Sequence, residues 1–131
     1  MSKITKTESE WKSLLTEQEY YVTRQKGTEP PFSGKNFEII NGGFFKCKCC
    51  GNELFNSSTK YDSYCGWPSF FEQISAEAIK TETDRSHGMV RIEIMCAKCD
   101  AHLGHVFDDG PEPTGKRYCV NSLSINYEEI E

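Results

Sequence analysis

The chain has 131 residues, enough for one ordinary domain with a buried hydrophobic core, and we expect a single domain over residues 1–131. Its 15 basic and 20 acidic residues give a net charge of −5, and the absence of a basic arm argues against a nucleic-acid partner. The N-terminus has no apolar signal region, and the longest unbroken apolar run is the four residues 94–97, so we expect no membrane segment.

Thr7 or Ser9 can cap a helix that we expect from Glu8 to Tyr20. Its apolar side chains follow the i, i+3, i+4 spacing of a single stripe: Trp11, Leu14 and Leu15. The spacing predicts that this N-terminal helix packs against the rest of the fold and serves as scaffold.

Turn-forming residues fill 27–31 and 33–36, so a loop should follow the helix. Two predicted strands, Phe37 to Ile40 and Phe44 to Lys48, then flank Asn41-Gly42-Gly43. A glycine pair after asparagine is typical of a tight β-turn, so this segment predicts a hairpin.

The next predicted strand runs from Met89 to Cys96, because apolar and charged residues alternate along it. The alternation sets Val90, Ile92 and Ile94 against Arg91 and Glu93. Before it, Glu72 to Lys80 is a weaker helix candidate. The whole pattern predicts a mainly β fold with a helical N-terminus.

Seven cysteines are many for this length, and four of them form two Cys-x-x-Cys pairs, Cys47 with Cys50 and Cys96 with Cys99. This spacing lets one tight turn direct two sulfurs at one tetrahedral ion, so we expect a structural zinc held by all four thiolates. Cys49 is left as an ordinary thiol. The alternative is that one pair is a thioredoxin-like redox motif or that the thiols are simply buried. An odd cysteine count also argues against secretion, so we expect the chain in the reducing cytoplasm. We also expect it to be a monomer.

Two histidines, His102 and His105, follow the second cysteine pair. They could complete a different metal site with Cys96 and Cys99, but that arrangement would leave the first cysteine pair without a role. A four-cysteine site instead frees both imidazoles for proton transfer near neutral pH. Hydrogen-bonded structural histidines are the remaining alternative, and we assign His87 to that class.

The two cysteines still without a role, Cys65 and Cys119, occupy different settings. If the segment around Cys119 is a strand, Arg117 and Asn121 share its face, and a cation there would favour a thiolate. Cys65 lies beside Trp67 in a loop rich in glycine and proline, which could carry a second thiol toward the first. Two ordinary buried cysteines remain the alternative.

Five segments resemble those of methionine sulfoxide reductase B, in the same order, and the resemblance extends over residues 8–127. The segments are 47–55, 65–70, 96–99, 102–109 and 117–122. The resemblance implies a fold of two antiparallel sheets with short N-terminal helices and a structural zinc. It also implies an enzyme that reduces the R epimer of methionine sulfoxide in oxidised proteins or peptides.

The same resemblance implies roles for individual residues. Cys119 would attack the sulfoxide sulfur and become a sulfenic acid, and Cys65 would then form a disulfide with it that thioredoxin reduces. The supporting residues are expected to be His102, His105, Asn121 and Arg117 around the reacting atoms, and Trp67 against the substrate methyl group. Two other classes stay open, a non-catalytic zinc-ribbon module that binds a protein and a peroxidase that uses the same two thiols.

Overall fold

The computed structural model describes residues 6–34, 42–61, 63 and 65–129. Its helices are α1 (Glu8–Leu14) and α2 (Glu17–Arg24), with short 3-10 turns at η1 (Ser57–Thr59), η2 (Ser86–Gly88) and η3 (Ser122–Ser124). Its strands are β1 (Gly43–Cys47), β2 (Glu53–Asn56), β3 (Lys60–Tyr61), β4 (Ser69–Phe70), β5 (Ile79–Asp84), β6 (Arg91–Cys96), β7 (His102–Phe107), β8 (Arg117–Val120) and β9 (Ile125–Glu129).

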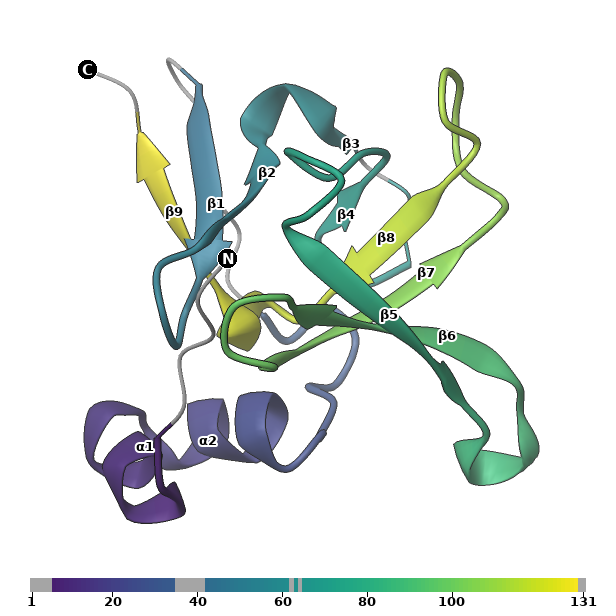
Figure 1. Cartoon of the computed structure of the whole chain (residues 1–131). Helices are drawn as coiled ribbons and strands as arrows, with labels where there is room; N and C mark the ends of the chain where they lie inside the picture. The colour runs from purple at the N-terminus through teal and green to yellow at the C-terminus, as the bar shows by residue number, and fades with distance from the viewer. Residues whose placement is uncertain (1–5, 35–41, 62, 64, 130–131) are drawn as a thin grey trace.

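The strands form two antiparallel sheets, as the family resemblance implied. One has the order β2-β1-β9, and the other has the order β3-β4-β8-β7-β6-β5. Figure 1 shows α1 and α2 together below the sheets and the β5–β6 hairpin projecting away from the body of the molecule. Because β7 and β8 lie in the middle of the larger sheet, the segments that carry the histidines and Cys119 are neighbours.

The prediction of a single N-terminal helix from Glu8 to Tyr20 is wrong, because the structure has two helices, α1 and α2, with a break between them. Thr7 caps α1 and Thr16 caps α2, each through a reciprocal pair of hydrogen bonds with a glutamate three residues later. The second capping box satisfies backbone N–H groups at a new helix start, which ends the first helix after two turns. Leu14 is consequently 62% exposed, and Trp11 is buried as expected.

In the described part of the chain, no helix is long and apolar enough to span a membrane.

The predicted strand Phe44 to Lys48 corresponds to β1, displaced by one residue. It pairs with β2 on one side and with β9 on the other, so it is the central strand of the smaller sheet. The predicted strand Phe37 to Ile40 and Asn41 of the predicted turn lie outside the described residues.

The predicted exposure pattern between Met89 and Cys96 is wrong, although β6 does form there. Val90 is 68% exposed and Ile92 is 39% exposed, whereas Glu93 is only 4% exposed. The outer part of the β5–β6 hairpin leaves the molecular body, so its apolar residues meet solvent. Glu93 lies farther in, where it meets His102.

The helix proposed for Glu72 to Lys80 is also absent from the structure. The segment forms bends, and its last residues start β5, in which Ile79 pairs with Cys96 and Lys80 with Met95. The Gln73 side chain accepts a hydrogen bond from the Ile79 backbone N–H. Sheet pairing has therefore overridden a weak local preference for helix.

A cluster of aromatic rings joins the two sheets. Phe55 stacks on Phe70 with ring centroids 4.1 Å apart, and Phe45 meets Phe70 edge-on at 4.9 Å. All three rings are fully buried, with Leu103 and Val120 in the same core. Since Phe70 directly follows the loop that carries Cys65, this packing fixes the end of that loop against β8.

Candidate active site and metal centre

The four cysteines of the two Cys-x-x-Cys pairs come together, and their sulfur atoms all lie within 4.8 Å of one another. The Cys47 and Cys99 sulfurs are 3.6 Å apart, as are those of Cys50 and Cys96. A zinc ion bound to four thiolates at about 2.3 Å would separate neighbouring sulfurs by about 3.8 Å. The cluster is therefore already close to the geometry that a tetrahedral metal ion requires.

Both pairs owe their shape to the same local turn. The Gly51 N–H donates to the Cys47 carbonyl at 2.9 Å, and the Asp100 N–H donates to the Cys96 carbonyl at 2.8 Å. Gly51 and Asp100 have positive φ angles of 79° and 66°, a conformation that glycine and aspartate tolerate best. The sequence thus builds two equivalent turns, and the two sheets bring them together at the ends of β1 and β6.

The charges in the cluster favour a bound cation. Hydrogen bonds with the neighbouring thiols raise the pKa of Cys47, whereas the hydrogen bond with Cys47 lowers the pKa of Cys96. Sulfurs this close cannot all be ionised without a compensating charge, which a metal ion would supply. Cys49 is half-buried beside the four but is not one of the clustered ligands.

The other two cysteines form a close pair. The Cys65 and Cys119 sulfurs are 2.9 Å apart, and both residues are free thiols. Cys119 lies in β8, opposite Ser69 of β4, and the Ser69 hydroxyl oxygen is 3.3 Å from the Cys65 sulfur. Little movement separates this pair from a disulfide, whose sulfurs are about 2.05 Å apart.

The two thiols differ in acidity. Burial alone would raise the pKa of Cys65, but hydrogen bonds from Cys119, Ser63 and Ser69 lower it to about 7. Burial raises the pKa of Cys119 to about 12, with a further contribution from the negative charge on Cys65. Arg117 does lower the pKa of Cys119, as we predicted, but these opposing effects outweigh it. The surroundings of the pair therefore favour ionisation of Cys65 over that of Cys119.

Arg117 is held in place beside Cys119. Its guanidinium Nη1 lies 3.5 Å from the Cys119 sulfur, and its Nε donates to the Asp109 carboxylate at 2.9 Å. The guanidinium also lies over the Phe107 ring, 4.3 Å from the centroid. An ion pair and a cation–π contact thus fix the orientation of the charge. Asp109 and Phe107 were not among our predicted site residues.

A cavity of about 270 Å³ opens beside Cys119. It brings together five predicted residues, Trp67, His105, Arg117, Cys119 and Asn121. Its other lining residues are Thr28, Arg91, Gly104 and Phe107. The volume is slightly below that of common small-molecule pockets, so a side chain of a larger substrate is a suitable occupant.

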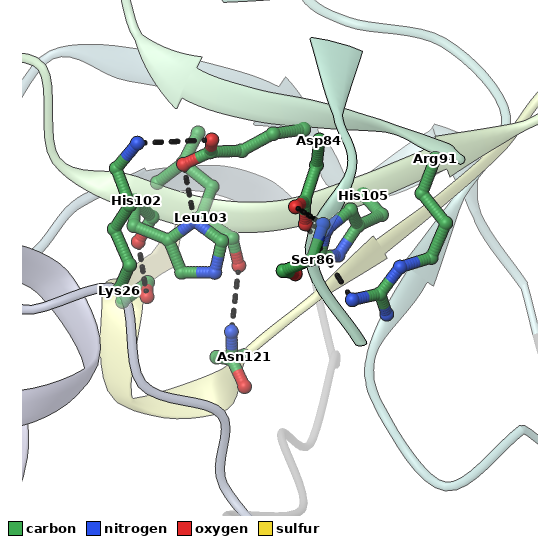
Figure 2. Close-up of polar contacts among 10 residues, drawn as sticks. Lys26, Asp84, Ser86, Arg91, His102, Leu103, His105 and Asn121 are labelled. Atoms are coloured by element: carbon green, nitrogen blue, oxygen red, sulfur yellow. Dashed lines mark hydrogen bonds and ion pairs between the residues drawn. The ribbon is translucent and has the colours of Figure 1, made fainter. Parts of the chain in front are cut away.

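The two histidines occupy different positions, as Figure 2 shows. His105 lies opposite Cys119 in the β7–β8 register and lines the cavity, and its Nε2 is 2.7 Å from the Asp84 carboxylate. His102 is buried and lines a neighbouring cavity of about 280 Å³, and its Nδ1 is 2.7 Å from the Glu93 carboxylate. Only His105 lines the cavity beside Cys119.

Each imidazole is paired with a carboxylate that itself meets a cation. Lys26 Nζ lies 3.3 Å from Glu93. Arg91 Nη2 lies 3.5 Å from Asp84 (Figure 2). Burial lowers the pKa of His102, and the hydrogen bond with His105 holds the pKa of Asp84 well below its usual range. The sequence reasoning missed these acids, because Glu93 occurs in a strand that we expected to be half exposed.

We had predicted that Asn121 shares one strand with Arg117 and Cys119, and this prediction is wrong. β8 ends at Val120, and Asn121 precedes η3. Its Nδ2 donates to the Leu103 carbonyl at 3.1 Å, and its Oδ1 accepts from the Glu29 N–H at 3.0 Å. The amide therefore ties three segments together at the cavity wall.

The fold and site together define a β protein with four clustered cysteines that could hold a metal ion and with a separate close pair of thiols. The crystal structure of the Mis18 "Yippee-like" domain has a similar fold, with a TM-score of 0.55 and 17% identity. That likeness covers 69% of this chain and 98% of the other. At this identity it describes the fold alone.

Sequence comparison identifies the family. The SelR domain profile matches residues 15–129. The chain is 57% identical to peptide methionine sulfoxide reductase MsrB of Acinetobacter baylyi and 55% identical to that of Hahella chejuensis, in each case over all 131 residues and 94% of the relative. The chain therefore belongs to the methionine sulfoxide reductase B family.

Proposed function

We propose that this chain reduces methionine sulfoxide to methionine and that it acts on the R epimer. The observation that supports this most strongly is the Cys65–Cys119 pair, with sulfurs 2.9 Å apart, in which Cys119 lines a cavity together with His105 and Trp67. A thiol pair that can cycle through a disulfide supplies the two electrons that sulfoxide reduction needs. The name of the relatives, peptide methionine sulfoxide reductase, agrees with this chemistry.

In the first step, Cys65 accepts the proton of Cys119 across their short contact. The resulting Cys119 thiolate has the Arg117 guanidinium 3.5 Å away, and that charge favours it. The thiolate attacks the sulfoxide sulfur, and one proton is taken up on the oxygen. The oxygen passes to Cys119 as a sulfenic acid, and the substrate leaves as the thioether.

His105 is the side chain best placed to meet the sulfoxide oxygen. It lies across from Cys119 in the cavity, and Asp84 occupies its Nε2, which leaves Nδ1 for the substrate. His102 acts less directly, since it is buried against Glu93 outside this cavity. Trp67 provides an apolar face for the substrate methyl group. These assignments give each residue a distinct part.

In the second step, the Cys65 thiol attacks the sulfenic sulfur of Cys119. A disulfide forms, and the oxygen leaves as water with the two remaining protons. An external dithiol must then reduce this disulfide, and we assign that part to thioredoxin. The substrates are oxidised proteins or peptides, and the enzyme works as a monomer in the cytoplasm.

The metal centre is structural, and zinc is the ion that we propose for it. Four thiolate sulfurs suit a soft or borderline ion, and a shell of four protein ligands leaves no position for substrate. The ion would join the turn after β1 to the turn after β6. It thereby holds the smaller sheet against the larger one, which carries Cys119.

Separated epimers test the proposed activity. The purified protein is incubated with R or S methionine sulfoxide and a dithiol, and methionine is measured. Methionine from the R epimer alone is expected, because one fixed arrangement of oxygen donor and methyl pocket accepts one hand of a sulfur stereocentre. Equal turnover of both epimers would refute the stereochemical part. Reduction of hydrogen peroxide without turnover of either epimer would indicate a peroxidase instead.

A further inference from the structure

We propose that Glu29 is a positioning residue that sets the depth of the methyl pocket, and so the enzyme's preference for a small alkyl group on the sulfoxide. The idea rests on the proposed function of Trp67 as the wall of that pocket. Glu29 was not among the predicted site residues, and it lies in the loop between α2 and β1.

The Glu29 side chain is buried, with 4% of the residue exposed. Its carboxylate accepts hydrogen bonds from the Ser122 hydroxyl at 2.8 and 3.0 Å and from the Leu123 N–H at 2.9 Å. These donors belong to the turn η3, directly after Asn121. A buried carboxylate with several donors is strongly held, because an ionised group away from water needs such partners.

The backbone of the same residue contacts two residues of the cavity wall. The Trp67 indole N–H donates to the Glu29 carbonyl at 2.9 Å. The Glu29 N–H donates to the Asn121 side-chain oxygen at 3.0 Å. One residue thus fixes both Trp67 and Asn121, and its own position is set by its carboxylate.

The loop around Glu29 also covers the segment between Cys65 and Trp67. The Phe32 N–H donates to the Gly66 carbonyl at 2.7 Å, and a Cβ added at Gly66 would lie 2.5 Å from Pro31. Gly66 has a φ of 98°, so this close approach depends on glycine. Thr28, next to Glu29, lines the cavity itself. The Glu29 anchor therefore controls how closely this loop and the indole approach the cavity.

The consequence is a prediction about specificity. An indole held at a fixed depth leaves room for a methyl group and penalises a longer alkyl chain. One methylene is worth roughly 10 to 200-fold in discrimination in a well-formed pocket. If the hydrogen bonds of the Glu29 carboxylate are lost, Trp67 can move away from the cavity. The pocket then accepts a longer alkyl group and binds the methyl group less tightly.

The experiment compares methionine sulfoxide with ethionine sulfoxide, its S-ethyl analogue, as R epimers with dithiothreitol as reductant. For Glu29→Ala we expect the preference for the methyl substrate, as a ratio of kcat/KM values, to fall about tenfold, with most of the change in KM. Glu29→Gln keeps one acceptor oxygen and should retain most of the preference. A shift of the Trp67 indole N–H signal in the NMR spectrum, with that of Trp11 unchanged, should accompany the Ala variant.

Thr16→Ala is the matched control, because it removes the cap of α2 and lowers stability without touching the cavity. In this variant, the ratio of kcat/KM for the methyl substrate to that for the ethyl substrate should stay unchanged. The ratio of the two KM values should also stay unchanged. An unchanged ratio in both folded Glu29 variants would overturn the inference. If Glu29→Ala does not fold, Ser122→Ala takes its place, because it removes the side-chain donor to the Glu29 carboxylate; it should lower the substrate ratio and shift the Trp67 indole signal, and an unchanged ratio in that variant would overturn the inference. If the wild-type protein reduces neither substrate, the proposed function itself has failed, so the two failures are distinguishable.

Discussion

The four-cysteine cluster and the thiol pair place the cysteine side chain in two different environments. In the cluster, four sulfurs lie within 4.8 Å of one another at the ends of two equivalent turns. In the pair, Cys65 comes from a loop and Cys119 from a central strand, with sulfurs 2.9 Å apart. The surroundings of a cysteine, rather than its residue type, decide whether its thiol binds a metal ion or reacts.

The physical difference lies in what balances the thiolate charge. A metal ion would neutralise the four ligand sulfurs and leave them without reactivity. In the pair, one proton and the Arg117 guanidinium are the balancing charges, so ionisation can move between Cys65 and Cys119.

Replacing the reactive thiol should have the largest effect. Cys119→Ser should lower methionine formation by several orders of magnitude, because a hydroxyl is not ionised near neutral pH and is a poor nucleophile. Methionine is measured after incubation with the R sulfoxide and dithiothreitol. Cys49→Ser, which alters a half-buried thiol that contacts Cys47 and Cys99 but is not one of the four clustered ligands, should stay active. Undiminished activity of Cys119→Ser would remove this residue from the mechanism.

Replacing a metal ligand should destroy the fold rather than the chemistry alone. Cys96→Ser should lose the metal ion and unfold, since a structural zinc site contributes on the order of 10 kcal/mol in apparent terms. Metal content by mass spectrometry and thermal unfolding by circular dichroism measure both effects. Cys49→Ser again serves as the control and should keep one ion per chain. A metal-free Cys96→Ser protein of normal stability would contradict the structural role.

Removing the second thiol should stop the cycle without preventing the first step. Cys65→Ser should release about one methionine per chain in a single turnover and then stall as the Cys119 sulfenic acid when thioredoxin is the reductant. Rapid-quench assays give the yield, and mass spectrometry identifies the sulfenic acid. In the oxidised wild type, Cys65 should be linked to Cys119. Steady turnover of the variant with thioredoxin would show that Cys65 has no resolving role.

The smallest effect is a difference in pH dependence between the two thiols. The thiolate is the reactive form, so alkylation of Cys65 should rise with pH through a midpoint of about 7 and fall as it is protonated below that. Cys119, with its pKa raised to about 12, should react little over the same range. Iodoacetamide labelling with peptide mapping measures both. In Cys65→Ser the pKa of Cys119 should fall, because the opposing charge is gone. Equal labelling of both thiols in the wild type would contradict the charge assignment.

The sequence was a good guide where a feature is local. Each Cys-x-x-Cys turn is closed by a hydrogen bond between residues four apart, so its spacing alone predicts two metal-binding turns. The β1 strand and the α1 cap at Thr7 follow equally short-range rules. The break at Thr16 also follows from a local motif, the capping box of Thr16 and Glu19. The prediction missed this motif because it followed the apolar stripe alone.

Pairings between distant segments depended on the tertiary structure. Glu93 appears in the sequence as the polar side of a half-exposed strand, yet the β6–β7 pairing buries it against His102. In the sequence, Glu29 is an acidic residue of a loop with no evident partner. In the structure, its carboxylate accepts hydrogen bonds from η3, more than 90 positions away in the chain. Neither partner can be found by periodicity, because periodicity describes one element at a time.

The candidate reacting and ligating side chains, and the β-rich class of the fold, can therefore be inferred from the sequence alone. The packing of distant segments is needed to find which histidine lines the cavity beside Cys119, which thiol of the pair is the more acidic, and which residue accepts the hydrogen bond of Trp67. The physical reason is that pKa values and hydrogen-bond partners depend on burial and on charges a few ångströms away. Those distances are set when segments far apart in the chain pack together.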